Sequence, residues 1–464
     1  MHFRVIQLDL IGIHVWRQTQ TQTVINNFAN EDLNILHPKY NTNPDTNRIM
    51  RMEFPIMQWI FALFFKLFGN HIIISRILTF IMGIFSVWGI YAMLMNIFDN
   101  KLCALIGAWA FNFSPEFYYY TINPLPDNFA LCCAIWSAVF FFSWVNSKKY
   151  YYLVLSFLFL TAAALAKLPF ILYASLPIGY ILVDFFKNKA LHTRRNILIL
   201  LFLLFMLCAP LAWYIKVMPT WNGNGIIKGI ADNKLKPLEI LDILQGNLIS
   251  TLPELLINYG SVLFFVAGFW FIFKRKVFQK SSFAIFLIWG LSILSYFFFE
   301  MNMIAKVHDY YLFPFMPLIF ILVAYGGYHL SISPMPYMRY LTFFLLLILP
   351  VTAYLRTVSR WNTEQPALNI DFYNYKNELR QLTGKNDYCV VGNDESHFIL
   401  LYYIDKKGWV FDHDYLPPAQ LKEWINKGAK YLYTDSSIDT LPGIKEHLAG
   451  KIFDKNSARV YRLK

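Results

Sequence analysis

Residues 14–55 read HVWRQTQTQTVINNFANEDLNILHPKYNTNPDTNRIMRMEFP. This segment is polar, whereas nearly all of the sequence after it, up to about residue 356, is hydrophobic. A polar segment of this size must lie in one aqueous compartment, because lipid offers no hydrogen-bond partners to it. The stretch therefore predicts a membrane protein with a large polar loop ahead of its apolar spans.

The composition of the chain supports a polytopic membrane protein. Of its 464 residues, 57% are hydrophobic and only 15% are charged, and the mean hydropathy is +0.40. Soluble domains carry about 25% charged residues. The formal net charge is +12, but the Lys and Arg residues gather in short runs between apolar segments. Cytoplasmic loops have this pattern under the positive-inside rule, so the basic excess indicates topology and no nucleic-acid partner is predicted.

The apolar segments predict ten membrane crossings within an all-α membrane domain. The expected spans are 71–98, 101–113, 129–146, 150–165, 167–184, 196–217, 256–273, 281–299, 310–329 and 338–356. If residues 1–70 are outside, the basic connections all fall inside. The outer connections then carry the most unusual polar residues of the chain.

The N-terminal part predicts helices that do not cross the membrane. Residues 1–13 are too short and too mixed for a signal peptide or a span. We therefore expect a first transmembrane helix ahead of the printed sequence, and translocation of the loop as an N-terminal tail is the alternative. After Pro55, the apolar run 56–69 carries Lys66 and suits a helix lying in the membrane interface.

The WRQTQTQTVINNFA stretch is compatible with an amphipathic helix. Trp16, Thr19, Thr23 and Phe28 lie at helical spacing within it.

The composition changes again near residue 358, so the sequence predicts three parts. Residues 1–70 form an outer loop with interfacial helices, and residues 71–356 form the transmembrane domain. Residues 357–464 form a small soluble α/β domain on the outer face. In the last part YCVVGN, WVFD, KYLYTD and ARVYRL are typical of strands, and FYNYKNELRQL and AQLKEWINKG of amphipathic helices. It contains no Gly-rich phosphate loop and no metal-ligand pattern, so stabilisation or acceptor handling is expected of it.

Asp127, in NPLPDNFA, is the strongest candidate for a catalytic group. It lies at the mouth of the membrane domain, just before an apolar run and after the aromatic residues 118–120. A carboxylate beside apolar helices is a candidate general base. The alternative is a helix cap, because an Asp at this place satisfies free backbone N–H groups.

Other charged residues gather at the same predicted boundary. Glu53 in RMEFP is a second candidate base, and the alternative is a loop carboxylate paired with Arg51. Lys306 and His308 precede Tyr310 in AKVHDYYLFP; cations on the outer side run against the topology rule, which favours anion binding over interfacial anchoring. Arg17 and Lys167 are further outer cations that either snorkel to the surface or bind phosphate. Together, the candidate residues at this boundary besides Asp127 are Glu53, Arg51, Lys306, His308, Tyr310, Arg17 and Lys167.

Several kinds of chemistry find no support in the sequence. No Ser-His-Asp arrangement, nucleotide-binding loop or His-rich metal motif is present, and the five Cys residues show no ligand spacing. ATP-driven chemistry is therefore not expected, and the energy for group transfer should come from an activated lipid. No cofactor is predicted, and a divalent metal ion is left open as a participant.

The order of these motifs resembles the GT-C glycosyltransferases. The motifs are WRQxxT in a polar first loop, MEFP followed by a helix ending KLFG, SP then PLPDNFA, LAK, and HDYYLFPFMP, which together cover about residues 10–330. Within that superfamily the chain is similar to the branch of aminoarabinose transferases and protein O-mannosyltransferases.

The resemblance implies transfer of a sugar from a polyprenyl-phosphate carrier to a lipid, glycan or protein acceptor of the cell envelope. It also implies a bacterial inner membrane, with the site and the C-terminal domain facing the periplasm. Asp127 matches the family's Asp at the start of a later span. Glu53 matches the acidic residue of its FEKP element, although Phe54 stands where relatives have Lys.

The first loop departs from the family pattern. Relatives carry Asp-Glu before the Arg, whereas this chain has His14 and Val15 before Trp16 and Arg17. Asp127, Glu53 or His14 is therefore expected to be the base, and Arg17, Lys306 and His308 to hold the phosphate. A lipid or glycan transporter without transferase activity is the alternative function, but it predicts mid-membrane charges and an internal repeat, and neither is seen.

Overall fold

The computed structural model describes the whole chain except residues 1, 189–193, 222–228, 230–234, 305–307 and 362–368. The chain forms two compact units. The first consists of Met1–His2, Met52–Met57 and Arg76–Ser359, and the second of Phe3–Arg51, Gln58–Ser75 and Arg360–Lys464.

The first unit is built from apolar helices. These are α4 (Ile72–Phe98), which enters it at Arg76, α5 (Lys101–Asn112), α6 (Pro115–Tyr120), α7 (Pro126–Ser147), α8 (Tyr150–Ala166), η2 (Leu168–Ala174), α9 (Ser175–Asn188), α10 (Arg194–Val217), η3 (Met218–Thr220), α12 (Pro237–Gly246), η4 (Asn247–Leu256), α13 (Tyr259–Lys274), η5 (Val277–Gln279), α14 (Phe283–Phe299), η6 (Asp309–Phe315), α15 (Met316–Ser331), α16 (Pro336–Thr357) and η7 (Val358–Trp361). Each of the ten expected spans coincides with a helix, because a long apolar run has few other ways to satisfy its backbone in lipid.

Six of the described helices are long and apolar enough to cross a membrane, and a bent pair, Pro237–Leu256 with Tyr259–Lys274, brings the number to seven. The apolar helices α8 and α14 have 17 residues each, and α5 has 12. The prediction of an all-α, multi-span membrane protein is confirmed.

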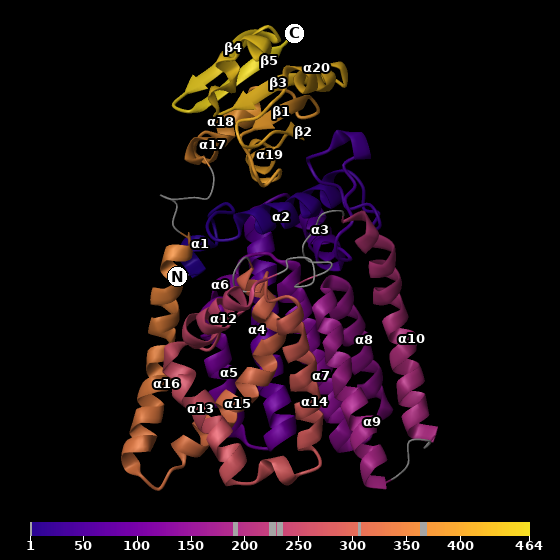
Figure 1. Ribbon diagram of the computed structural model, residues 1–464, viewed down its shortest axis with the longest axis vertical. Coiled ribbons are helices and arrows are strands. Elements are labelled where there is room, and N and C mark those ends of the chain that lie inside the picture. The colour runs from indigo at the N-terminus through magenta and orange to yellow at the C-terminus, as the bar shows by residue number, and fades with distance from the viewer. Residues whose placement is uncertain (1, 189–193, 222–228, 230–234, 305–307, 362–368) are drawn as a thin grey trace. The chain divides into compact units, whose positions relative to one another are not determined.

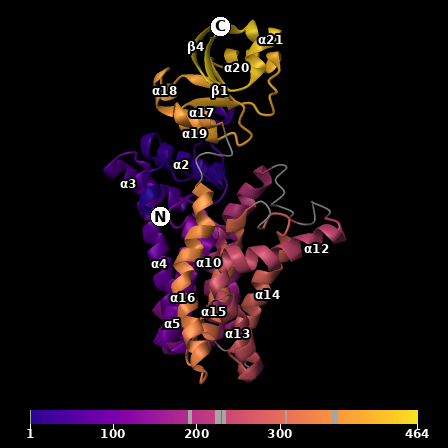
Figure 2. The ribbon, with the colours of Figure 1, turned by 90° about the vertical axis from the view of Figure 1, so that its left-hand side faces the viewer.

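Helix α15 occupies the centre of this unit. In the span Asp309–Ser331, 72% of the most apolar window is buried, against 28% in Arg194–Thr220. Helix α15 contacts α5, α13 and α16, and Figures 1 and 2 show these helices running alongside one another. The more exposed helices present large apolar side chains, such as Phe205 on α10, on their outer surface.

Two glycines bring α13 and α15 into backbone contact. A Cβ atom on Gly326 would lie 1.9 Å from the carbonyl oxygen of Phe264, and one on Gly268 would lie 2.3 Å from the carbonyl oxygen of Leu322. Small residues at helix crossings allow this close approach in membrane proteins. The contact therefore requires glycine at both positions.

The second unit contains the polar N-terminal segment together with the C-terminal domain. Its N-terminal elements are α2 (Val15–Asn30), η1 (Pro44–Thr46) and most of α3 (Ile56–Phe68), and a short helix α1 (His2–Val5) begins at its border. Helix α2 confirms the helix expected over WRQTQTQTVINNFA, but the amphipathic pattern is wrong. Trp16 is 47% exposed, and most of the polar side chains of α2 are buried.

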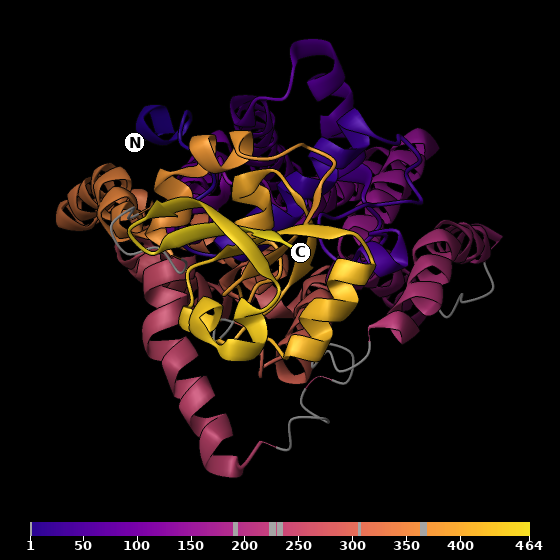
Figure 3. The same cartoon turned by 90° about the horizontal axis from the view of Figure 1, so that it is seen from above.

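The C-terminal domain is a five-stranded sheet with helices, as expected for a small α/β domain. Its elements are α17 (Ile370–Asn374), α18 (Lys376–Gln381), β1 (Tyr388–Gly392), α19 (Ile399–Ile404), β2 (Lys407–Val410), α20 (Pro418–Asn426), β3 (Ala429–Thr434), η8 (Ser437–Thr440), α21 (Pro442–Lys445), β4 (Leu448–Lys455) and β5 (Ala458–Leu463). The strand order is β2-β1-β3-β5-β4. Strands β2, β1 and β3 are parallel, and β5 pairs antiparallel with both β3 and β4. Figure 3 shows the sheet from above with α20 beside it.

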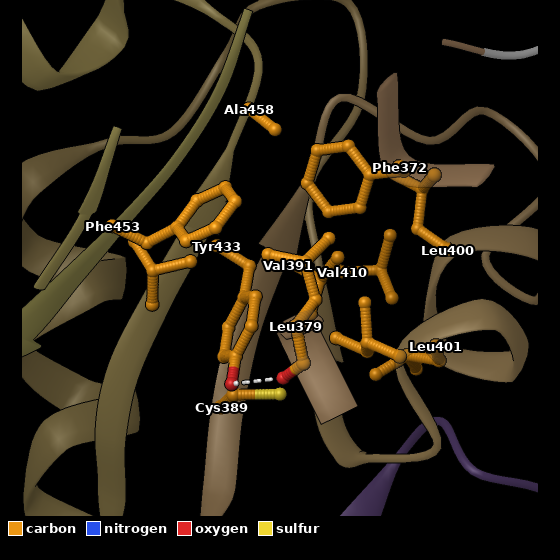
Figure 4. Packing of buried hydrophobic residues seen from close by; sticks show 12 residues of the cluster. Phe372, Leu379, Cys389, Val391, Leu400, Leu401, Val410, Tyr433, Phe453 and Ala458 are labelled. Carbon is orange, nitrogen blue, oxygen red and sulfur yellow. Dashed lines mark hydrogen bonds between the residues drawn. The ribbon is translucent and has the colours of Figure 1, made fainter. Parts of the chain in front are cut away.

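Both faces of this sheet are covered by apolar side chains, since successive residues of a strand point to opposite faces. Cys389 and Val391 of β1 belong to one core cluster, and Val390 between them belongs to the other. Figure 4 shows the first cluster, in which the Tyr433 hydroxyl donates a hydrogen bond of 3.3 Å to the Leu379 carbonyl. The sequence did not predict α19 or β4.

We expect Gly326→Ala to destabilise the membrane unit, because the added methyl group overlaps the Phe264 carbonyl and forces α13 and α15 apart. Overpacking of this kind costs about 1–3 kcal/mol. Thermal unfolding of the purified protein in detergent should show a lower Tm. Gly246→Ala is the matched control, since no atom lies within 4 Å of a Cβ at that helical position. An unchanged Tm for Gly326→Ala would contradict the close packing.

Candidate active site

The ends of α7 and α8 bring two opposite charges together. The two helices pack side by side, and only Lys148 and Lys149 separate them in sequence. They therefore run antiparallel, so that the start of α7 meets the end of α8. Asp127 lies in the first turn of α7, and Lys167 is the residue that caps α8.

Asp127 and Lys167 form a buried ion pair. The Asp127 Oδ1 atom lies 3.1 Å from Lys167 Nζ, and the Asp127 residue is 1% exposed. Each charge also complements its helix, because the dipole favours a carboxylate at the N-terminus and a cation at the C-terminus. Among the described residues, the Asp127 Oδ2 atom has no hydrogen-bond partner although it is buried. One oxygen is thus fixed by lysine while the other is available as an acceptor.

The helix cap itself does not come from Asp127. The N-cap residue of α7 is Leu125, followed by Pro126 at the first helical position, where its missing N–H costs nothing. The structure places the Asp127 carboxylate against Lys167 instead.

A buried hydrogen-bond network fixes the loop that leads to Asp127. Arg76 is fully buried and donates two bonds of 3.0 Å, to the Ile122 carbonyl and to Asn123 Oδ1. The Asn128 side chain donates to the carbonyls of Tyr120 and Asn123 at 2.6 and 3.0 Å. The backbone on both sides of α7's first turn is therefore held, which fixes the position of Asp127.

Aromatic side chains form the surroundings of Lys167. Its ammonium lies 4.6 Å from the centre of the Tyr311 ring and 5.5 Å from that of Tyr310, distances at which a cation is attracted to a ring face. The Tyr310 hydroxyl lies 3.1 Å from His308 Nδ1. This arrangement connects Asp127, Lys167, Tyr310 and His308, which the sequence had singled out separately.

Two acidic groups, Asp309 and Glu300, also lie in this region, and of these only Asp309, in the AKVHDYYLFP motif, stands out in the sequence. The Tyr120 hydroxyl donates a 2.7 Å hydrogen bond to Asp309, which precedes Tyr310. Glu300 follows the last residue of α14 and is 5% exposed, and its Oε2 atom has no hydrogen-bond partner among the described residues. Burial raises the pKa of Glu300 to about 7, and the Lys167 ammonium opposes that rise. A single carboxylate at the end of an apolar run was its only signal in the sequence.

Glu53 lies in a segment that is held next to α8. The Phe54 amide donates to the Leu165 carbonyl at 3.0 Å, and Trp213 Nε1 donates to the Met52 carbonyl at 3.0 Å. Glu53 stands between these two anchored residues and is 7% exposed. Leu165 is two residues before Lys167, so the MEFP and LAK motifs meet.

Three of the residues predicted for the site belong to the second unit. His14 precedes α2 in a left-handed conformation with φ of 57°. Arg17 is buried in α2, where its guanidinium donates to the Gln20 side chain. Arg51 donates to the Leu36 carbonyl at 3.0 Å. Lys306 lies outside the described residues.

Within the described parts of the chain, no cluster of three or more His, Cys, Asp or Glu side chains has the geometry to hold a metal ion.

Comparisons with known proteins agree with the motif order. A protein-family model described as Dolichyl-phosphate-mannose-protein mannosyltransferase matches residues 53–214, which include Glu53, Asp127 and Lys167. The fold is similar to that of ArnT from Cupriavidus metallidurans in the apo state, at a TM-score of 0.64 and 13% identity over 98% of this chain and 94% of that one. This chain has the same fold as ArnT.

A second structure, ArnT from the same organism bound to undecaprenyl phosphate, matches the fold of this chain with a TM-score of 0.62. The identity is 11%, over 99% of this chain and 95% of that chain. A search among curated protein sequences found no match. The family model indicates a glycosyltransferase, as the sequence motifs predict, and the likeness to the two ArnT structures shows the fold.

The Glu300 carboxyl should make the stability of the protein depend on pH. Its pKa is raised from 4.5 to about 7 in the folded state, so its contribution to stability is fully present below pH 4.5 and is lost as the pH rises through about 7. Glu300→Gln removes this titration. The Tm of the variant, relative to wild type, should therefore increase between pH 5 and pH 8.

Thermal unfolding of both proteins over that pH range measures the difference. Glu395→Gln, an exposed carboxyl of the C-terminal domain, is the control and should show no such trend. A Tm difference between Glu300→Gln and wild type that stays constant from pH 5 to pH 8 would show that Glu300 does not titrate there.

Proposed function

We propose that this protein transfers a sugar from a polyprenyl-phosphate carrier to a hydroxyl group of a cell-envelope acceptor, at the periplasmic face of a bacterial inner membrane. The observation that carries the proposal is the buried carboxylate of Asp127, which has one oxygen paired with Lys167 and the other without a hydrogen-bond partner among the described residues. This carboxylate belongs to a chain with the fold of ArnT.

The donor supplies the energy for the reaction. In a polyprenyl-phosphate sugar, the bond between the anomeric carbon and the phosphate oxygen already has a good leaving group. Catalysis then requires a base for the acceptor hydroxyl, groups that stabilise the departing phosphate, and exclusion of water. One ArnT structure contains undecaprenyl phosphate, which supports a carrier of this class for the present chain.

Asp127 is the proposed base. Its Oδ2 atom accepts the proton of the acceptor hydroxyl while the acceptor oxygen attacks the anomeric carbon. The bond from that carbon to the phosphate oxygen breaks, and its electron pair leaves with the phosphate. Lys167 holds the other carboxylate oxygen, which keeps the Asp127 side chain oriented during the reaction. Glu53 and His14 remain the alternative bases.

The phosphate is assigned to groups that donate hydrogen bonds. His308 and Tyr310 are in contact with each other beside Lys167, and an imidazole N–H and a phenol O–H can both donate to a phosphate oxygen. Lys306, two residues before His308, and the Arg17 guanidinium are proposed as further phosphate contacts. Arg51 is proposed to support the same binding from the RMEFP motif.

Asp127→Asn should abolish transfer while the protein is still produced and folded. An amide cannot accept the acceptor's proton, and loss of a general base costs about 100- to 10,000-fold in rate. The assay measures release of undecaprenyl phosphate from an undecaprenyl-phosphate-linked sugar by the purified variant in lipid vesicles, with a cell-envelope extract as the source of acceptor. The Tm of the variant confirms that it is folded.

Asp414→Asn is the control, because Asp414 is an exposed residue of the C-terminal domain and the same chemical change there should leave the rate unchanged. Normal transfer by the Asp127→Asn protein would rule out Asp127 as the base.

A further inference from the structure

A polar cavity lies within the second unit, apart from the groups assigned to the transfer step. Its volume is about 800 Å³, within the range of about 300–1,000 Å³ that is usual for small-ligand sites. The residues that line it come from the segment before α2, from α2 itself, from the α3–α4 connection, and from the loops around β1 and β2 of the C-terminal domain. All of these belong to one compact unit.

Side-chain amides dominate the lining of this cavity, which we call the amide cavity. Eight of its 19 lining residues are Asn or Gln. Three of them, Gln22, Asn26 and Asn30, are spaced four residues apart on α2 and therefore share one face of that helix. The Gln22 side chain donates to Asn26 Oδ1 at 2.8 Å, and Asn70 donates to Asn30 Oδ1 at 2.7 Å. The amides thus form a continuous, ordered strip.

The charges that line the amide cavity are equal in number, and Asp9 and Glu31 have further cationic partners outside the lining, Lys376 and Lys39. Three carboxylates and three cations line it, and each carboxylate has one of these cations as a partner. The pairs are Glu31 with Lys407 at 2.6 Å, Asp405 with Lys385 at 3.7 Å, and Asp9 with Arg380 at 3.8 Å. An anionic ligand would have to compete with these carboxylates for the cations. The balance therefore favours a neutral ligand.

The buried side-chain amide of Gln22 indicates where a ligand group would bind. Gln22 is 2% exposed, and its Oε1 atom has no hydrogen-bond partner among the described residues, although its amide nitrogen is bonded to Asn26. A buried acceptor without a donor costs about 1–3 kcal/mol. A ligand hydroxyl that donates to this oxygen would remove that cost. Because an amide both donates and accepts, a strip of amides suits a ligand that carries several hydroxyl groups.

We propose that the amide cavity binds neutral saccharide residues of the acceptor, so that the acceptor of the transfer reaction is a glycan or glycolipid with an uncharged sugar portion. The assignment of the saccharide to the acceptor rests on the proposed function. The rings of Phe65 and Tyr402 also line the cavity and offer apolar surface to the C–H faces of a sugar. The ligand class follows from the amides, the balanced charges and the unpartnered Gln22 oxygen.

The test measures binding of neutral trisaccharides to the full-length protein in nanodiscs by saturation-transfer NMR. The neutral probes are trisaccharides of glucose, of mannose, of galactose and of N-acetylglucosamine. There are two anionic probes: a trisaccharide of galacturonic acid, and inorganic phosphate. At least one neutral trisaccharide should bind, and the anionic probes should not. Binding only of galacturonic acid or phosphate would overturn the proposal.

Gln22→Leu and Asn386→Ala should each weaken that binding by about tenfold or more, whereas Gln420→Ala, an exposed amide on α20, should not change it. Asn386 is an exposed lining residue, so its variant tests the cavity even if Gln22→Leu fails to fold. Binding that is equal in wild type and Asn386→Ala would place the saccharide elsewhere and overturn the proposal.

Release of undecaprenyl phosphate from the donor, measured on the same samples, separates this inference from the proposed function. A protein that releases undecaprenyl phosphate but binds no neutral trisaccharide overturns the role of the amide cavity and leaves the transferase proposal standing. A protein that binds a trisaccharide in the cavity but does not use the donor overturns the transferase proposal, and the acceptor assignment with it. Donor use and transfer to the bound trisaccharide by wild type and Gln420→Ala, with both reduced in the cavity variants, is the result we expect.

Discussion

The ion pair between Asp127 and Lys167 is the interaction on which the candidate site depends. Removing two charges from water costs several kcal/mol per ion, and only close pairing with further favourable contacts offsets this cost. Here the contacts come from the ends of two helices, whose dipoles favour a carboxylate at the start of α7 and a cation at the end of α8. A shift of one helical turn, about 5.4 Å, between α7 and α8 would separate the charges. The packing of α7 against α8 therefore also fixes the geometry of the site.

Much of the membrane unit could be predicted from the sequence because hydropathy decides where an apolar helix begins and ends. The span expected at 71–98 is α4 (Ile72–Phe98), and that at 150–165 is α8 (Tyr150–Ala166). The pairing of Asp127 with Lys167 could also be predicted from the sequence. Two helices joined by only two residues run antiparallel, so the start of the first lies beside the end of the second. The position of Glu300 beside Lys167 was not, because it depends on how α14 packs and not on local pattern.

The second unit was harder to predict because tertiary contacts override local pattern there. Strand β4 has mostly exposed residues and lacks the alternation that marks a half-buried strand. Helix α19 is a six-residue apolar run, ILLYYI, which a buried strand would match equally well. Helix α2 is polar in sequence yet mostly buried, and its Thr19 and Thr21 hydroxyls donate to the backbone carbonyls of Trp16 and Arg17 one turn earlier.

The central claim is that this chain breaks the sugar–phosphate bond of a lipid-linked donor, and does not merely move such a lipid across the membrane. The most direct measurement follows undecaprenyl-phosphate-linked sugar with time after it is added, together with a cell-envelope extract that supplies the acceptor, to vesicles that contain the purified wild-type protein. The account predicts that undecaprenyl phosphate accumulates in proportion to the amount of protein and that the rate saturates with donor concentration. A donor that crosses the vesicle membrane but stays chemically intact would contradict the account and favour a transporter.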